Sequence, residues 1–173
     1  MTNEKEVLAT IRDIPDYPKK GIVFKDITPL LGEGKIFKSV IADLAELCKG
    51  EGITKIVGIE SRGFIFGAAL AEVLGLGFVP IRKKGKLPYK KVSETFTLEY
   101  GSDIIEMHED ALSPKDKVII IDDLLATGGT TRAALSLVSK LGAKTLFCLY
   151  VIELTFLEGG KTLKVPYKSL IKY

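Results

Sequence analysis

The sequence predicts an α/β domain built on a parallel sheet, and three observations support this fold class. Short runs of β-branched residues alternate with stretches whose apolar residues recur at helical spacing. The run KVIIID at 117–122 is almost entirely apolar, which is typical of a strand buried on both faces. A chain of 173 residues is long enough for one domain with a sizeable core. We therefore expect a single domain over 1–173, with flanking helices and right-handed crossovers.

The expected helices and strands can be placed in order along this domain. The stretch 34–50 has the apolar stripe of an amphipathic helix. The next helix should stop at Gly75, because glycine favours the left-handed conformation that ends helices. In chain order we expect a helix at 34–50, a strand at 53–60, a helix at 62–75, a strand at 77–83, the two strands of a hairpin at 92–100 and 103–109, a strand at 117–122, a helix at 132–142 and a strand at 143–154.

Composition and charge indicate a globular protein of the cytoplasm. Hydrophobic residues make up 46% of the chain and charged residues 27%. The net charge of +3 is mild, so it does not point to a nucleic-acid partner. Cys48 and Cys148 lie in apolar stretches without the spacing of a metal clamp or redox pair, which favours buried thiols in a reducing compartment. The charged first residues and the absence of an apolar run of ~20 residues argue against a signal peptide and a membrane span.

Two familiar chemistries are disfavoured because their residues are missing. His108 is the only histidine, so a zinc site or a Ser-His-Asp triad would rest on a single side chain. The glycines Gly58 and Gly63 have the spacing of a nucleotide-binding phosphate loop, but Phe64 follows where that motif needs lysine. The sequence therefore gives no support to an ordinary kinase or ATPase.

The stretch VIIIDDLLATGGTT at 118–131 carries the strongest functional signal. Asp122 and Asp123 stand at the carboxyl end of a predicted buried strand, where ligands of open parallel sheets bind. The following helix begins within TGGTTR, and a helix N-terminus preceded by glycines offers N–H groups and a positive dipole to an anion. The alternative is that Thr127 caps the helix and the aspartates are turn residues, as they would be in an isolated DD or TGG.

The complete stretch favours a ribose 5-phosphate over that alternative. Two carboxylates beside a phosphate site would repel the phosphate unless they faced another part of the ligand. The vicinal hydroxyls of a ribose donate hydrogen bonds, and they are natural partners for such a carboxylate pair.

VIIIDDLLATGGTT resembles the phosphoribosyl-diphosphate signature of the type I phosphoribosyltransferases. Further segments resemble the adenine phosphoribosyltransferase family: GIVFKDITPLL, GIESRGFIFG, IRKKGKLPY, LEYG and VIELTFLEGGKTL. The resemblance implies the parallel-sheet fold of that family, with flanking helices and a mobile hood. It also implies a role in purine salvage, in which adenine and phosphoribosyl diphosphate give AMP and pyrophosphate. Mg²⁺ is the implied cofactor, bound mainly through the substrate diphosphate, without a metal site on the chain itself.

The resemblance assigns site residues position by position. It implies catalytic roles for Glu99, Asp122, Asp123 and Arg62. The aspartate pair is expected to hold the ribose hydroxyls, and Arg62 and Arg82 the diphosphate. Cations on the leaving diphosphate and carboxylates near the positively charged sugar both lower the barrier. The 5-phosphate loop is expected to comprise Ala126, Thr127, Gly128, Gly129 and Thr130.

The N-terminal segment 1–33 is implied to bind the base. Phe24 and Leu124 match the pair that sandwiches adenine, and the backbone around Lys25 would read its edge. Lys25 departs from the arginine expected there, and the two cations are not interchangeable at a site that uses a planar fork. Phe24 could also be an ordinary core residue.

The region 82–110 is implied to form the hood loop and hairpin over the site. Its basic run RKKGKLPYKK could alternatively be a solvated loop or a nucleic-acid patch. A closing hood would exclude water from the activated sugar. Glu99 matches an acid that exchanges a proton with the purine, and Lys83, Lys86 and Tyr100 are expected to bind substrate.

Two other functions stay open from the sequence. The same chemistry could act on a 6-oxo or 2,6-dioxo purine, or the chain could be a regulator that senses phosphoribosyl diphosphate. A regulator would need an added nucleic-acid-binding module, for which the sequence offers little room. We expect no nucleic-acid or membrane partner, and the resemblance implies a homodimer.

Overall fold

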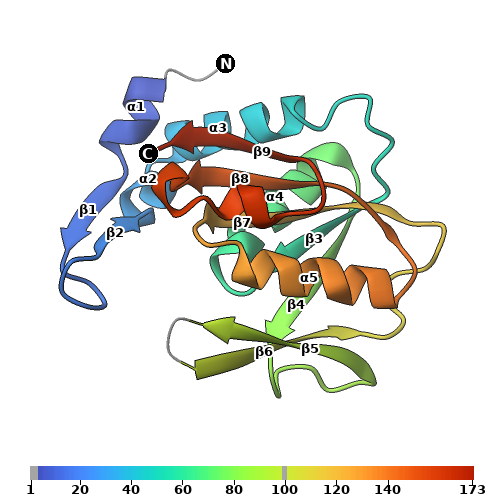
Figure 1. Ribbon diagram of the computed structural model, residues 1–173. Helices are drawn as coiled ribbons and strands as arrows, with labels where there is room; N and C mark the ends of the chain where they lie inside the picture. Colours follow the sequence, from blue (N-terminus) through green and yellow to red (C-terminus); the bar gives the residue numbers. More distant parts are fainter. Residues whose placement is uncertain (1–3, 99–100) are drawn as a thin grey trace.

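The computed structural model describes residues 4–98 and 101–173, which fold around a seven-stranded sheet (Figure 1). The strand order is β5-β6-β4-β3-β7-β8-β9. Strands β4, β3, β7, β8 and β9 are parallel, whereas β6 pairs antiparallel with both β4 and β5. The bounds are β3 Lys55–Ile59, β4 Gly77–Lys83, β5 Lys91–Leu98, β6 Gly101–His108, β7 Lys117–Leu125, β8 Lys144–Glu153 and β9 Tyr167–Lys172.

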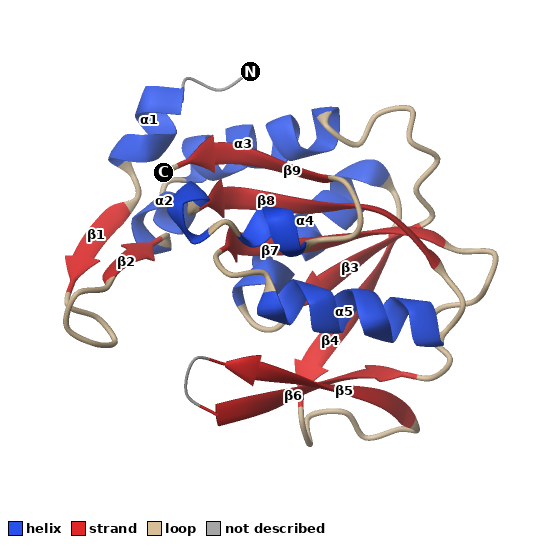
Figure 2. Cartoon of the chain, in the orientation of Figure 1, coloured by secondary structure: helices blue, strands red, loops and turns tan. Residues whose placement is uncertain are grey.

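Helices cover both faces of the parallel part of the sheet (Figure 2). α3 (Gly34–Glu46) and α4 (Arg62–Leu74) pack on one face, and α5 (Gly129–Lys140) packs on the other. Strand β7 supplies both cores, because Ile119 and Ile121 face the α3–α4 side and Ile120 faces α5. All three side chains are fully buried, so the prediction of a strand buried on both faces is confirmed.

The expected helices and strands are present, with changed boundaries. α4 ends at Gly75, whose φ of 65° is left-handed as predicted. β7 runs on to Leu125, so Asp123 as well as Asp122 lies within the strand. The predicted hairpin is formed by β5 and β6, and it joins the sheet through β4 as an antiparallel edge. The sheet is therefore mostly parallel, with an antiparallel extension that the sequence pattern did not indicate.

Several short elements were not predicted. The N-terminal ones are α1 (Glu4–Ala9), strands β1 (Arg12–Pro15) and β2 (Val23–Asp26), and α2 (Thr28–Gly32). β1 and β2 form an antiparallel ribbon at the same end of the molecule as the carboxyl ends of the parallel strands (Figure 1). Near the C-terminus, the 3₁₀ turns η1 (Thr155–Leu157) and η2 (Gly159–Thr162) precede β9. None of the helices in the described part of the chain could span a membrane.

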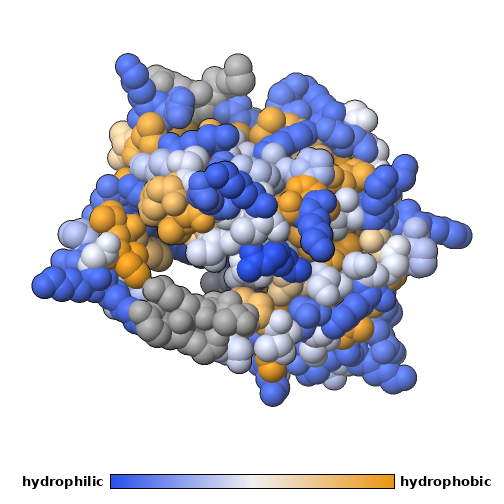
Figure 3. Space-filling view, in the orientation of Figure 1, coloured by the Kyte–Doolittle hydropathy of each residue, from blue (hydrophilic) through white to orange (hydrophobic). Residues whose placement is uncertain are grey.

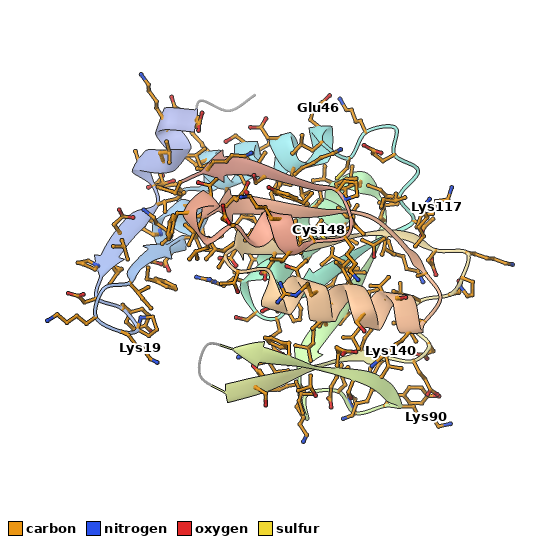
Figure 4. All side chains as sticks on the ribbon, in the orientation of Figure 1. Lys19, Glu46, Lys90, Lys117, Lys140 and Cys148 are labelled. Atoms are coloured by element: carbon orange, nitrogen blue, oxygen red, sulfur yellow. The ribbon has the colours of Figure 1, made fainter. Side chains whose placement is uncertain are left out.

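Figure 4 draws the side chains on the ribbon, with Cys148 on β8 and Lys140 on α5 labelled. Cys48 and Cys148 are free and buried, as predicted, and burial raises the pKa of Cys48 to about 11 and that of Cys148 to about 12.

The β5–β6 hairpin contacts α5 through Glu94. Its carboxylate accepts a hydrogen bond from Ser136 Oγ at 2.7 Å and forms an ion pair with Lys140 Nζ at 2.7 Å. The hairpin and the helix that follows the glycine turn are thus directly connected.

Candidate active site

A pocket of about 330 Å³ lies where β3, β4 and β7 end, close to the first turn of α5. Its wall combines acids, a guanidinium, an ammonium and hydroxyls with a few apolar side chains. Figure 3 shows this side of the molecule hollowed between the N-terminal ribbon and the body of the domain. The lining residues are Ile59, Glu60, Ser61, Arg62, Lys83, Phe96, Asp103, Ile105, Asp122, Asp123 and Thr130.

The aspartate pair and Arg62 form the centre of the pocket. Neighbouring residues of a strand point to opposite faces, so Asp122 and Asp123 approach the pocket from different sides of β7. Asp123 is buried, with 3% of its surface exposed, and Arg62 Nε contacts its Oδ2 at 2.9 Å. Asp122 Oδ1 accepts a hydrogen bond from the Asp123 backbone N–H at 2.9 Å. The sequence prediction thus brought together three side chains that meet in the structure.

Both carboxyl groups are held in a state that disfavours ionisation. Burial, followed by the charge of Asp123, raises the pKa of Asp122 well above its usual value of 3.8. Burial also raises the pKa of Asp123, although the Arg62 guanidinium opposes this rise. A ligand that donates hydrogen bonds or develops positive charge here would stabilise the ionised forms, so the pair is suited to a cationic, hydroxyl-bearing centre.

The glycine turn forms the start of α5, as predicted. Gly128 is the N-cap residue with a φ of 78°, a left-handed conformation that favours glycine, and no side chain caps the helix. The alternative in which Thr127 caps the helix is therefore wrong. Uncapped N–H groups and the helix dipole remain available to an anion beside Thr130, which lines the pocket. Thr131 Oγ1 is hydrogen-bonded to the Tyr150 hydroxyl at 2.8 Å, which ties this turn to β8.

The basic segment after β4 is fixed by two glutamates that the sequence analysis did not single out. Glu60 accepts hydrogen bonds from Arg82 Nε at 3.0 Å and from the Lys83 backbone N–H at 2.7 Å. Burial raises the pKa of Glu60, but these two bonds together with the charges of Arg82 and Lys86 outweigh burial and hold it below its usual value. Glu106 accepts a bond from the Gly85 backbone N–H at 3.0 Å. The position of Glu60 at the carboxyl end of β3 was the signal that could have identified it.

The basic residues of this segment are distributed unevenly. Lys83 lines the pocket, and its Nζ lies 3.6 Å from Asp103 Oδ2. Arg82 is directed to Glu60, beside the pocket. Lys86 does not line the pocket, and its backbone N–H bonds to the Lys83 carbonyl oxygen at 3.2 Å. The structure therefore brings Lys83 to the acids and leaves Lys86 outside this cavity.

The N-terminal ribbon reaches the site through Phe24. Its ring centroid lies 5.1 Å from the Arg62 guanidinium and 5.3 Å from the Tyr17 ring. The Lys25 ammonium does not contact Arg62 or the acids. Its Nζ lies 2.7 Å from Asp13 Oδ1 and 3.7 Å from the centre of the Tyr173 ring. Its ammonium therefore holds the ribbon together, which leaves the backbone of Lys25 as its route to a ligand.

The other predicted site residues fall into three places. Leu124 is half-buried and packs against the α3–α4 core. Ala126 lies two residues before the left-handed Gly128, and Gly129 is the first residue of α5. Glu99 and Tyr100 lie outside the described residues. In the described part of the chain, no group of three or more His, Cys, Asp or Glu side chains could hold a metal ion.

Comparison with known proteins identifies the family. The phosphoribosyl transferase domain model matches residues 27–172. Adenine phosphoribosyltransferase from Solidesulfovibrio magneticus is 60% identical over 154 residues, covering 89% of this chain and 90% of that protein. The crystal structure of adenine phosphoribosyltransferase from Thermoanaerobacter pseudethanolicus has a TM-score of 0.97 and 49% identity, covering 99% of this chain and 100% of that chain.

A structure that contains ligands is also similar. Saccharomyces cerevisiae adenine phosphoribosyltransferase, crystallised with an imino-altritol bisphosphate and adenine, has a TM-score of 0.92 and 41% identity, covering 96% of this chain and 97% of that chain. The family model, over residues 27–172, includes the seven-stranded sheet and the glycine turn. By its domain, sequence and fold, the chain belongs to the adenine phosphoribosyltransferase family.

Proposed function

We propose that this chain transfers the 5-phosphoribosyl group from phosphoribosyl diphosphate to adenine, giving AMP and pyrophosphate in purine salvage. One observation carries the proposal: Asp122, Asp123 and Arg62 meet in a pocket that adjoins an uncapped glycine turn. An anion site, a carboxylate pair and a guanidinium correspond to the three parts of the donor, which are its 5-phosphate, its ribose and its diphosphate. Family membership supports the same reaction.

The 5-phosphate is proposed to bind to the turn formed by 126–130. The first N–H groups of α5 have no helical partner, and the positive end of the helix dipole lies at the same place. Thr127 and Thr130 add hydroxyl donors. Binding here fixes the sugar so that its anomeric carbon lies near the acids, and such positioning can supply a large part of the rate acceleration.

The aspartate pair is proposed to hold the ribose hydroxyls and to stabilise the sugar as the bond to diphosphate breaks. The sugar gains positive charge at that moment, and ionised carboxylates stabilise it more strongly than they stabilise the neutral ground state. The raised pKa of Asp122 and of Asp123 supports this role, because burial of the two carboxyl groups is not fully offset by donors from the chain. Their compensation therefore falls to the substrate.

Arg62 and Arg82 are proposed to bind the diphosphate, with Lys83 and Lys86 beside them. Among residues 4–98 and 101–173 no group of three or more metal-ligating side chains could hold a cation, which suits Mg²⁺, an ion usually held by one or two carboxylates together with substrate phosphates. We propose that Mg²⁺ binds mainly through the diphosphate oxygens, without a metal site on the chain itself. When bound, the ion neutralises charge on the leaving diphosphate.

Adenine is proposed to lie between Phe24 and Leu124, with the backbone at Lys25 reading its edge. This arrangement makes 1–33 the base-binding segment of a single domain over 1–173. The region 82–110 would serve as the hood, with Glu99 exchanging a proton with the purine and Tyr100 contacting substrate. We further propose a homodimer that works in the cytoplasm.

The test offers the purified protein adenine, hypoxanthine, guanine and xanthine, each with phosphoribosyl diphosphate and Mg²⁺. Adenine presents an amino donor at C6 and an acceptor at N1, and 6-oxo purines present the reverse. A site built for one pattern can reject the other by roughly 10⁴-fold. We therefore expect AMP formation from adenine and almost none of the other nucleotides. Preference for a 6-oxo purine would change the substrate, and binding of phosphoribosyl diphosphate without turnover of any base would instead indicate a regulator.

A further inference from the structure

The back of the phosphate turn is held by a contact between α5 and η2. Arg132, on the first turn of α5, donates from Nη1 to the Thr127 carbonyl oxygen at 3.2 Å and to Thr162 Oγ1 at 2.7 Å. Thr162 Oγ1 in turn donates to the Gly159 carbonyl oxygen at 2.7 Å. One guanidinium nitrogen thus joins the turn before the helix to a segment some thirty residues further along the chain.

The turn and η2 touch without space for a side chain between them. A β-carbon at Gly128 would lie 2.6 Å from Thr162 Oγ1 and 2.9 Å from the Gly159 carbonyl oxygen. A β-carbon at Gly159 would overlap the Ala126 carbonyl oxygen. Backbone contacts this close fix the position of the turn from behind, because neither side can shift without displacing the other.

The hydrogen bond from Arg132 to the Thr127 carbonyl oxygen also fixes the direction of the Gly128 backbone N–H. In a planar trans peptide the N–H points opposite to the C=O. Since the Thr127 carbonyl oxygen is directed to Arg132, the N–H of Gly128 is directed to the other face of the turn. If the carbonyl rotated to that face, an acceptor would replace a donor where a phosphate oxygen should bind.

We propose that Arg132 and Thr162 are positioning residues for the 5-phosphate site, which they hold in its binding conformation without touching the substrate. This inference rests on the proposed function of the turn. Both residues line a second cavity of about 570 Å³, which lies beside α5 and includes Ser139 and Lys164. Neither of them lines the 330 Å³ pocket that contains the aspartate pair. Their contacts with one another and with the backbone therefore lie outside that pocket, although Arg132 also lines a cavity of about 230 Å³ together with Gly129.

The experiment compares Arg132→Met, Thr162→Val and the double variant in steady-state kinetics. Each single change should raise the KM for phosphoribosyl diphosphate about 10-fold, the typical worth of one lost hydrogen bond to a charged group. The KM for adenine and the Tm should stay within error. The KM of the double variant for phosphoribosyl diphosphate should not exceed the higher of the two single-variant values, because both changes break the same connection. Arg132→Lys and Thr162→Ser, which keep a donor and a hydroxyl, should recover most of the affinity.

Ser139→Ala is the matched control, since Ser139 is on the same helix and lines the same cavity but makes no part of the connection. An Arg132→Met defect with normal Thr162→Val would overturn the proposal and indicate a direct charge contact with substrate. Additive defects, or equal changes in both KM values, would also overturn it. Titration calorimetry with ribose 5-phosphate gives the same comparison without turnover. If the wild type formed no AMP, the proposed reaction would be refuted, but calorimetry with ribose 5-phosphate would still test the positioning role.

Discussion

Buried aspartates lie at both ends of strand β7, and their pKa values are shifted in opposite directions. Asp116, just before the strand, is 9% exposed, and Asp123, near its end, is 3% exposed. The pKa of Asp116 is lowered, whereas the pKa of Asp122 and that of Asp123 are raised. The shifts are opposite because Asp116 lies close to the surface and is surrounded by donors from the chain, whereas the pair lies deeper and burial outweighs its donors.

Asp116 is surrounded by donors from the protein itself. Its carboxylate accepts bonds from the Ser113 backbone N–H at 2.8 Å and Ser113 Oγ at 2.9 Å, from Thr54 Oγ1 at 3.0 Å, and from Lys55 Nζ at 3.3 Å. Burial raises its pKa, but these bonds together outweigh burial. The ionised form is satisfied before any ligand arrives, which is the property of a structural carboxylate.

The aspartate pair has far fewer donors for two carboxyl groups. Among the described residues, Arg62 forms the ion pair with Asp123, and a backbone N–H serves Asp122. The backbone N–H groups of Asp123 and Leu124 also lower the pKa of Asp123, but burial outweighs these donors. Two adjacent acids with incomplete partners destabilise the free protein and favour a ligand that supplies the missing donors. The contrast teaches that a functional carboxylate can be recognised by the donors it lacks.

The largest expected effect is on turnover. Asp122→Asn and Asp123→Asn should each lower kcat by about 10²- to 10³-fold, because the lost charge faced the developing positive charge of the sugar. Circular dichroism should show an unchanged fold. Asp116→Asn serves as the matched control and should leave kcat near that of the wild type. Normal turnover in the Asp122→Asn, Asp123→Asn double variant would contradict the assignment.

The next effect is on stability at the other end of the strand. Asp116→Ala should lower the free energy of unfolding by about 2 to 3 kcal/mol, because it removes an acceptor shared by several buried donors. Urea denaturation at neutral pH measures this change. Below the unfolding transition, kcat should be unaffected. A large fall in kcat with unchanged stability would mean that Asp116 belongs to the functional site after all.

The smallest effect has the opposite sign. Asp122→Asn should raise the Tm at neutral pH, since a carboxyl whose pKa is raised on folding destabilises the folded state when it is ionised. In the wild type this destabilisation sets in as pH rises from 3.8 through the raised pKa, so the gain should vanish near pH 3.8. The stability provided by Asp116 should instead be lost as pH falls below 3.8. A lower Tm for Asp122→Asn at neutral pH would refute this account.

The sequence predicted the parts of the fold that depend on residues close together in the chain. The apolar run of β7, the stripe of α3 and the stop at Gly75 depend on local spacing, and they were confirmed. The ribbon β1–β2 and strand β9 were missed because they are short, and their burial depends on distant partners. The antiparallel junction of β6 with β4 is likewise a long-range pairing without a local signal.

The site was predicted where one motif contained it and missed where contacts cross the chain. The acids and the glycine turn lie in a single stretch, and the family resemblance added Arg62, which the structure places in the same pocket as the acids. Glu60 and Arg132 act through partners far away in sequence, at Arg82 and at Thr162. Such pairings cannot be deduced from spacing, because only the folded sheet brings them together.

The burial of both cysteines makes the protein suitable for site-specific labelling. With pKa values of about 11 and 12, the two native thiols carry almost no thiolate at neutral pH, and reagents cannot easily reach them. A cysteine introduced on the surface should therefore react alone. Pairs of such positions, one on the N-terminal ribbon and one on the β5–β6 hairpin, would report by fluorescence energy transfer whether the two edges of the active-site pocket approach each other as substrate binds.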